Sequence, residues 1–161
     1  MKMYFEDLEV GAVFRGDECV ADKDEMLEYA RKNDPSPFHV DEEAARNSPY
    51  GGLIASAGYT VTLWYRSGIP ISRSLAFLGG FEWHIKLPLP VRPGDRLHTE
   101  VEIRNKKPSS KPGRGYVTTS QKIINQDSQA VFTCECVLMI ATKPRWAGRR
   151  CLMGLPREVI E

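Results

Sequence analysis

The sequence lacks the usual signs of a metal protein, a secreted protein or a membrane protein. None of its four cysteines belongs to a CxxC pair and its three histidines are scattered, so the spacing of zinc ligands is absent and we expect no metal. The first residues lack the apolar stretch of a secretory signal, and no apolar run approaches the ~18 residues of a spanning helix. These absences predict a reduced, cytoplasmic protein that does not enter a membrane.

The chain also lacks an excess of charge of either sign. Its 22 basic and 21 acidic residues leave a formal net charge of +1, so no global field draws it to nucleic acid or to an anionic membrane. Walker, GxGxxG and GxSxG motifs are absent too, which leaves nucleotide hydrolysis, a dinucleotide cofactor and a serine hydrolase without support. At 161 residues the chain is long enough to bury a stable core in one domain.

The first part of the chain has the pattern of a short strand followed by a helix. We expect a strand over Val13–Val20 and then a helix capped by Asp22, with Glu25 completing a capping box. This helix should end by Asp34, because the residue before Pro35 is pushed out of the α region.

Two further helices are predicted before the chain changes its pattern. The first is short and covers Asp41–Arg46. The second, over Leu53–Arg66, is apolar almost all round, which is typical of a buried helix. It should end near Ser67–Gly68, before Pro70.

From about Ser74 the hydrophobic period is two, which indicates half-buried antiparallel strands. A helix that is apolar on most sides must be buried by other elements, and the most economical arrangement is a sheet wrapped around it. We therefore predict an α+β fold with a sheet curled around one central helix, in a single domain over residues 1–142, with a C-terminal extension of unknown role over residues 143–161. The expected strands are Phe81–Leu87, Leu97–Arg104, Tyr116–Asn125 and Val131–Thr142, with an exposed loop over Lys106–Gly115.

Hydrophobic pattern also assigns other reactive or aromatic residues to the core or the surface. His84 and His98 lie on the polar phase of their strands and are interpreted as solvent or interface residues. Cys134 and Cys136 lie two residues apart in one strand and point the same way, so they are poor disulfide partners and are predicted to be core residues. Three aromatic residues are also predicted to lie in the core: Trp64, Tyr65 and Trp83.

Asp34 and His39 are the first candidates for chemistry. They lie five residues apart in a segment stiffened by Pro35 and Pro37. A carboxylate and an imidazole that face one pocket can hold a water and move its proton, and the carboxylate favours the charged imidazole. A lone loop histidine is more often structural, and Asp-Pro is a common turn signal. Their occurrence together in one rigid segment favours general acid–base chemistry.

Ser56, Ala57 and Gly58 are the second group of candidates, in the first turns of the predicted buried helix. Backbone N–H groups at a helix start lack internal partners and lie at the positive end of the helix dipole. They can hold a thioester oxygen as it becomes an enolate. The alternative is that small residues here only permit close packing.

Several segments resemble the MaoC-like dehydratase family of (R)-specific enoyl-CoA hydratases. The run Asp34–Asp41 resembles its hydratase motif, Tyr50–Ser56 resembles the segment that leads into its central helix, and Leu87–Asp95 is similar to its strand-turn segment. The resemblance covers residues 4 to 142. The Asp-to-His segment followed by the glycine turn is the more specific part, and the Pro-Gly-Asp turn alone is weak.

The resemblance implies a hot-dog fold, at least a homodimer, and an acyl thioester of coenzyme A or of acyl carrier protein as substrate. Asp34 and His39 would be the catalytic pair that adds water to a trans-2-enoyl thioester, giving a 3-hydroxyacyl thioester. The backbone N–H of Ala57 would match the oxyanion position, with Ser56 and Gly58 beside it. No metal or redox cofactor is implied, because the thioester itself acidifies the α-carbon.

The chain departs from the family pattern at three places. Asn33 stands where the family often has Gly, Ser36 where it often has Asn, and Ala57 where it often has Gly after a His or Ser. Serine still offers a hydrogen bond, and alanine still offers its N–H while its methyl narrows the approach. These departures bear on substrate identity more than on the type of reaction. Two alternatives stay open: a hot-dog acyl-CoA thioesterase with Asp34 as base or nucleophile, and a non-catalytic subunit that binds acyl thioesters.

Overall fold

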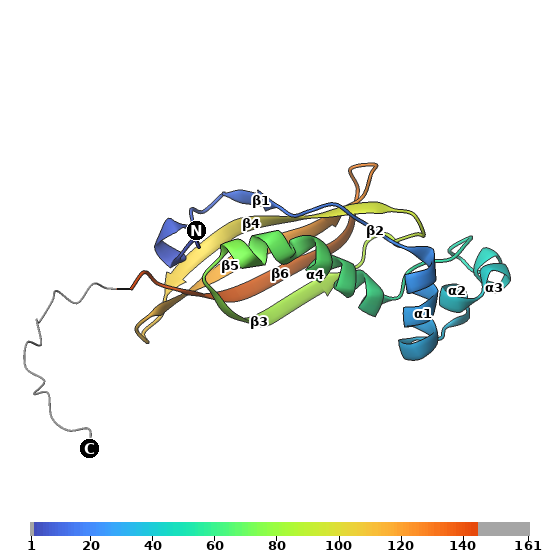
Figure 1. The fold of residues 1–161 in the computed structure, drawn as a ribbon, viewed down its shortest axis with the longest axis horizontal. Helices are drawn as coiled ribbons and strands as arrows, with labels where there is room; N and C mark the ends of the chain where they lie inside the picture. Colours follow the sequence, from blue (N-terminus) through green and yellow to red (C-terminus); the bar gives the residue numbers. More distant parts are fainter. Residues whose placement is uncertain (1, 145–161) are drawn as a thin grey trace, which may run out of the picture.

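The computed structural model describes residues 2–144, in which six strands form one antiparallel sheet around a long helix (Figure 1). The sheet order is β1-β4-β5-β6-β3, and β2 also pairs with β4. This confirms the predicted α+β hot-dog fold. The elements in chain order are η1 (Phe5–Asp7), β1 (Val13–Arg15), β2 (Cys19–Val20), α1 (Lys23–Asn33), α2 (Pro37–Val40), α3 (Glu42–Arg46), α4 (Ala57–Ser74), β3 (Phe77–Lys86), β4 (Arg96–Pro108), β5 (Arg114–Ile124) and β6 (Ala130–Ala141).

The central helix α4 lies along the inner face of the sheet, and α1, α2 and α3 gather at the end where α4 begins (Figure 1). On β4 the predicted alternation is confirmed, since Leu97, Thr99, Val101 and Ile103 are all buried. Trp64 is also buried on α4, and its indole N–H donates to the buried Gln121 Oε1 at 2.9 Å. The core therefore lies between α4 and the sheet, as one buried helix requires.

Several strand boundaries differ from the sequence prediction. The single strand expected over Val13–Val20 is two short strands, β1 and β2, which pair with different parts of β4. The exposed loop expected over Lys106–Gly115 is shorter than predicted and covers residues 109–113, because β4 continues to Pro108 and β5 begins at Arg114. Cross-strand pairing extends both strands through this polar segment, down to Pro108 opposite Gly115. Ladder hydrogen bonds therefore outweigh the local composition here.

Helix α1 begins and ends as predicted. Asp22 is its N-cap, with Oδ1 accepting from the Glu25 N–H at 2.9 Å. The reciprocal half of the predicted capping box is absent within residues 2–144, because the Glu25 carboxylate instead accepts from the Tyr59 hydroxyl and from Arg66, both at 2.8 Å. Asp34 is the C-cap, consistent with the restriction that Pro35 imposes.

The predicted limits of α4 are wrong at both ends. The residues before Ser56 are not helical, because the N–H of Ile54 donates to Phe38 O at 3.3 Å and that of Ala55 to Val91 O at 2.8 Å. At the other end the helix passes through Pro70 and reaches Ser74. Ser67 anchors this half, since its hydroxyl donates to Asp17 O at 2.6 Å and accepts from the Thr99 N–H at 2.7 Å.

Strand β3 is exposed, which the sequence did not predict. It lies at the sheet edge with β6 as its only strand neighbour among residues 2–144. Trp83 is 48% exposed on this strand and Tyr65 is 50% exposed on α4, so both predictions of core placement are wrong. Alternation predicts that one face of a strand is apolar, but it does not say whether the same chain covers that face.

The predicted burial of the cysteines is confirmed, and that of the histidines is confirmed only in part. Cys134 and Cys136 are buried and free, with their sulfur atoms 3.2 Å apart, so their prediction as core residues is confirmed. His84 is exposed as predicted, whereas the side chain of His98 is only 13% exposed.

Lys143 contacts Glu6 and Asp7, while the rest of the predicted extension lies outside the described residues from 145 onward. None of the helices between residues 2 and 144 is long and apolar enough to cross a membrane.

Candidate active site

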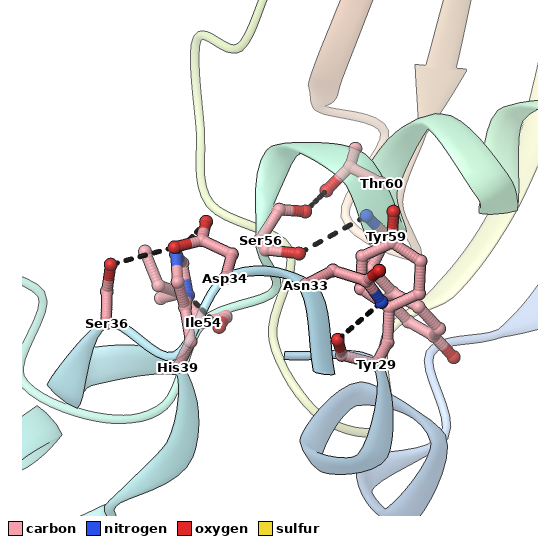
Figure 2. Close-up of polar contacts among 9 residues, drawn as sticks. All are labelled: Tyr29, Asn33, Asp34, Ser36, His39, Ile54, Ser56, Tyr59 and Thr60. Carbon is pink, nitrogen blue, oxygen red and sulfur yellow. Dashed lines mark hydrogen bonds and ion pairs between the residues drawn. The ribbon is translucent and has the colours of Figure 1, made fainter. Parts of the chain in front are cut away.

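The sequence around two prolines brings Asp34 and His39 together. Asp34 closes α1 with its N–H donating to Ala30 O at 2.8 Å, and Pro35 then prevents the helix from continuing. A new one-turn helix, α2, starts immediately with Pro37 at its first position and carries His39. The loop predicted around His39 is therefore partly helical. His39 Nε2 lies 3.4 Å from Asp34 Oδ2 (Figure 2).

The other ring nitrogen of His39 fixes its tautomer. Nδ1 lies 2.8 Å from the backbone oxygen of Ile54, which can only accept, so Nδ1 carries the hydrogen. In the neutral imidazole, Nε2 is then the basic nitrogen and faces Asp34. The His39 side chain is 8% exposed and the Asp34 side chain 44% exposed. The histidine is thus held in the protein while the carboxylate reaches solvent.

Asp34 is held by a neighbour on its second oxygen. The Ser36 hydroxyl donates to Asp34 Oδ1 at 2.8 Å, which leaves Oδ2 toward His39 (Figure 2). Phe38 packs edge-on against the imidazole with ring centres 4.5 Å apart, and its other neighbour is Tyr50 at 5.1 Å. Each member of the pair therefore has its own orienting contact.

The start of α4 lies beside this pair because Ile54 is tied to α2 in both directions. Ile54 donates its N–H to Phe38 and accepts from His39, two residues before the N-cap of α4. Ser56 is that N-cap, with its hydroxyl oxygen accepting from the Tyr59 N–H at 3.3 Å. The predicted position of Ser56 inside the helix is corrected to its boundary.

Ala57 and Gly58 consequently occupy the first two positions of α4. Backbone N–H groups at these positions have no partner inside the helix and lie at the positive end of its dipole. A helix that began at Leu53 would have used these donors internally. The observed start leaves them available to an oxygen placed between α4 and the Asp34–His39 pair.

Sequence reasoning missed the contact of Tyr29 with the start of α4. Tyr29 lies on α1, and a Cβ added to Gly58 would be 2.5 Å from its hydroxyl, so these residues meet where α4 begins. Tyr59 packs against it with ring centres 5.7 Å apart. Local spacing gave no signal for this contact, because Tyr29 lies five residues before the C-cap Asp34 and only the packing of α1 against α4 brings it to Gly58.

Charged residues brace α1 against α4 next to the site. Glu25 accepts from Arg66 and Tyr59, and these hydrogen bonds, the one from Arg66 first, hold the pKa of the Glu25 carboxyl below its ordinary value. The same contact raises the pKa of the Arg66 guanidinium. Burial, and then the hydrogen bond to Glu25, raise the pKa of the Tyr59 phenol, which keeps its proton. The Glu25, Tyr59 and Arg66 side chains therefore join α1 to α4 but do not face Asp34 or His39.

Two hollows lie outside the pair itself. An apolar cavity of about 440 Å³ separates α4 from β3 and β6, with Trp64, Tyr65 and Trp83 in its lining. A smaller pocket of about 300 Å³ lies over Leu53 and includes Lys23 and Arg92. Neither is lined by Asp34 or His39. Residues 2–144 contain no group of three or more His, Cys, Asp or Glu side chains placed to hold a metal ion.

Comparison with known proteins places these observations in a family. The sequence profile of the MaoC like domain matches residues 8–125. The uncharacterised protein YdeM of Bacillus subtilis (strain 168) is 32% identical over 143 residues, which cover 86% of this chain and 99% of YdeM.

Solved structures of similar proteins have the same fold as this chain. A MaoC-like dehydratase from Rhodospirillum rubrum is 32% identical, with a TM-score of 0.81 over 88% of this chain and 99% of that one. The R-hydratase PhaJ1 of Pseudomonas aeruginosa, 21% identical, shares the fold with a TM-score of 0.67 over 99% of this chain and 97% of its own.

Proposed function

Because this chain belongs to the MaoC-like domain family, we propose that it is a hydratase or dehydratase that adds water reversibly to a trans-2-enoyl thioester. The substrate would be a thioester of coenzyme A or of acyl carrier protein, and the product a 3-hydroxyacyl thioester. The observation that carries this proposal is the His39 tautomer: its basic Nε2 faces Asp34 Oδ2 beside the first N–H groups of α4, which have no partner inside that helix.

In the hydration direction, a water held between Asp34 and His39 gives a proton to His39 Nε2 as its oxygen bonds to C3. Asp34, oriented by Ser36, accepts a hydrogen bond from the O–H that stays on the water oxygen and becomes the 3-hydroxyl, and its charge stabilises the imidazolium that forms. Electrons move from the C2–C3 double bond to the thioester oxygen, which the N–H of Ala57 binds as an enolate. His39 then returns the proton to C2, so one water is added in all. Dehydration follows the same steps in reverse.

The chemistry is complete without a redox step or a metal. The thioester carbonyl stabilises the carbanion at C2, so the protein has to supply only a positioned base and an oxyanion donor. A positioned acid–base group contributes roughly 10²–10⁴ in rate and one oxyanion donor roughly 10²–10³. The Asp34–His39 pair would supply the first contribution, and the Ala57 N–H would supply the second.

The test is loss of the enoyl-thioester absorbance with crotonyl-CoA and with longer trans-2-enoyl-CoA substrates. Wild-type protein should consume the band and form 3-hydroxyacyl-CoA, while Asp34→Asn and His39→Ala should each lose roughly 10²–10⁴ in kcat. Asp24→Asn is the matched control, since Asp24 is exposed in the first turn of α1. Full activity in His39→Ala would reject the proposal. Release of free CoA thiol without a hydroxyacyl product would instead indicate a thioesterase.

We also propose that the protein works as a homodimer through β3. This edge strand exposes Phe81, Trp83 and Ile85, and an apolar edge invites pairing with another strand. Sedimentation should give twice the chain mass, and Trp83→Asp should shift it toward the monomer. A wild-type monomer at working concentration would contradict this part of the proposal and leave the chemistry to its own test.

A further inference from the structure

We propose that Tyr29 is a further catalytic residue, whose hydroxyl donates a hydrogen bond to the thioester oxygen held at the start of α4. The inference rests on the proposed function and adds a side-chain donor to the backbone donors already described. It concerns a residue that neither the motif around Asp34 nor the glycine turn before α4 includes.

The contact between Tyr29 and Gly58 places this hydroxyl. A Cβ on Gly58 would lie 2.5 Å from the Tyr29 oxygen and 3.2 Å from two carbons of its ring. Gly58 is the second residue of α4, so the hydroxyl lies against the turn whose N–H groups point out of the helix. A methyl group at this position would displace the hydroxyl end of the Tyr29 side chain. Figure 2 shows Tyr29 beside Tyr59 where α4 begins.

The two neighbouring tyrosines differ in what their hydroxyls do. The Tyr59 hydroxyl donates to Glu25 Oε2 at 2.8 Å and is committed to the brace between α1 and α4. Within residues 2–144 the Tyr29 hydroxyl has no hydrogen-bond partner, and it is not among the buried side-chain atoms that lack one, so it is open to solvent in the free protein. A tyrosine hydroxyl normally finds a hydrogen-bond partner once it is buried, and a bound thioester would cover this one. The acceptor that the proposed reaction brings to this place is the thioester oxygen.

The hydroxyl would matter more in the transition state than before it. The thioester oxygen gains charge as the enolate forms, and a hydrogen bond to a charged acceptor is stronger than one to a neutral carbonyl. Tyr29 keeps its proton throughout, and the electron pair returns from oxygen to C2 when His39 protonates that carbon. The residue thus stabilises charge and transfers nothing.

The experiment compares Tyr29→Phe with Tyr59→Phe on crotonyl-CoA, together with thermal unfolding of both. Tyr29→Phe should lower kcat by about 10² with little change in KM or in melting temperature, because one oxyanion donor is lost. Tyr59→Phe should lower the melting temperature and keep its kcat, because its hydroxyl serves the brace. Wild-type kcat in Tyr29→Phe overturns the inference while the proposed function stands. A wild-type protein that turns over no thioester overturns both.

A second pair of variants tests the placement without an activity readout. Gly58→Ala should lower the melting temperature, since its methyl would meet the Tyr29 hydroxyl. Adding Tyr29→Phe should restore part of that loss, because the nearest remaining ring atoms are 3.2 Å away. Strict additivity of the two changes would show that the hydroxyl is not at Gly58 and would overturn the inference.

Discussion

Two histidine–carboxylate pairs in this protein have the same separation and different surroundings. His39 Nε2 lies 3.4 Å from Asp34 Oδ2, and His98 Nε2 lies 3.4 Å from Glu100 Oε1. Both histidines are largely buried and both carboxylates are about 40% exposed. Distance and burial therefore do not tell the pairs apart.

The difference lies in the second contacts of each pair. His39 has its Nδ1 fixed by Ile54 and Asp34 has its other oxygen bound by Ser36, beside a helix start with free N–H groups. His98 and Glu100 are two residues apart on one face of β4, and the other ring nitrogen has no partner among residues 2–144. The comparison teaches that a fixed tautomer and a nearby donor, and not proximity, distinguish the pair that we propose as reactive.

The sharpest way to break the comparison is to remove each pair. His39→Ala combined with Asp34→Asn should lose roughly 10²–10⁴ in kcat, and the double variant should lose little more than either alone, because the two act as a unit. His98→Ala combined with Glu100→Gln should keep wild-type kcat. Steady-state hydration of crotonyl-CoA measures both. Equal losses in the two pairs would mean that proximity alone is sufficient.

A smaller change removes only the second contact of Asp34. Ser36→Ala takes away the hydroxyl that donates at 2.8 Å, so the carboxylate is free to rotate away from His39. We expect kcat to fall roughly tenfold, which corresponds to about 1.4 kcal/mol of transition-state stabilisation. Ser72→Ala, on the exposed side of α4, is the control. Unchanged kcat in Ser36→Ala would show that Asp34 is positioned by other contacts.

The helix start beside His39 can be tested through its cap. Ser56→Ala removes the hydroxyl that accepts from Tyr59 N–H, and loss of an N-cap costs about 1 kcal/mol of unfolding free energy. Chemical denaturation should show this loss, and KM or kcat should change with it if α4 holds the thioester. A variant as stable as wild type would mean that water replaces the cap without cost.

The smallest expected effect concerns Glu25, a carboxylate shared by two partners in the brace. Its pKa is lower in the folded protein than in the unfolded chain, so its contribution to stability is complete above about pH 4.3 and is lost as pH falls through the folded pKa. Glu25→Gln should therefore lower the free energy of unfolding at neutral pH. The decrease in this free energy from neutral to acidic pH should be smaller in the variant than in the wild type. The effect should be below about 1 kcal/mol because Glu25 and Arg66 are both partly exposed. Identical pH–stability curves would contradict it.

The sequence by itself determined the class of fold and the candidate pair. Period-two strands after Ser74 and one apolar helix favour a sheet around that helix, since this is the economical arrangement that buries both. Pro35 ends α1 at Asp34, and Pro37 begins the turn that carries His39, so their closeness is a local consequence of two fixed φ angles.

Tertiary structure alone decided the features that make the pair a candidate site. Hydrogen bonds from Ile54 and Ala55 to distant residues hold the segment before Ser56 out of the helix, so α4 starts where Ala57 and Gly58 present their N–H groups. The His39 tautomer depends on Ile54, fifteen residues away, and the space for the Tyr29 hydroxyl depends on Gly58. Local pattern cannot specify such contacts, because each joins backbone and side chains that only packing brings together.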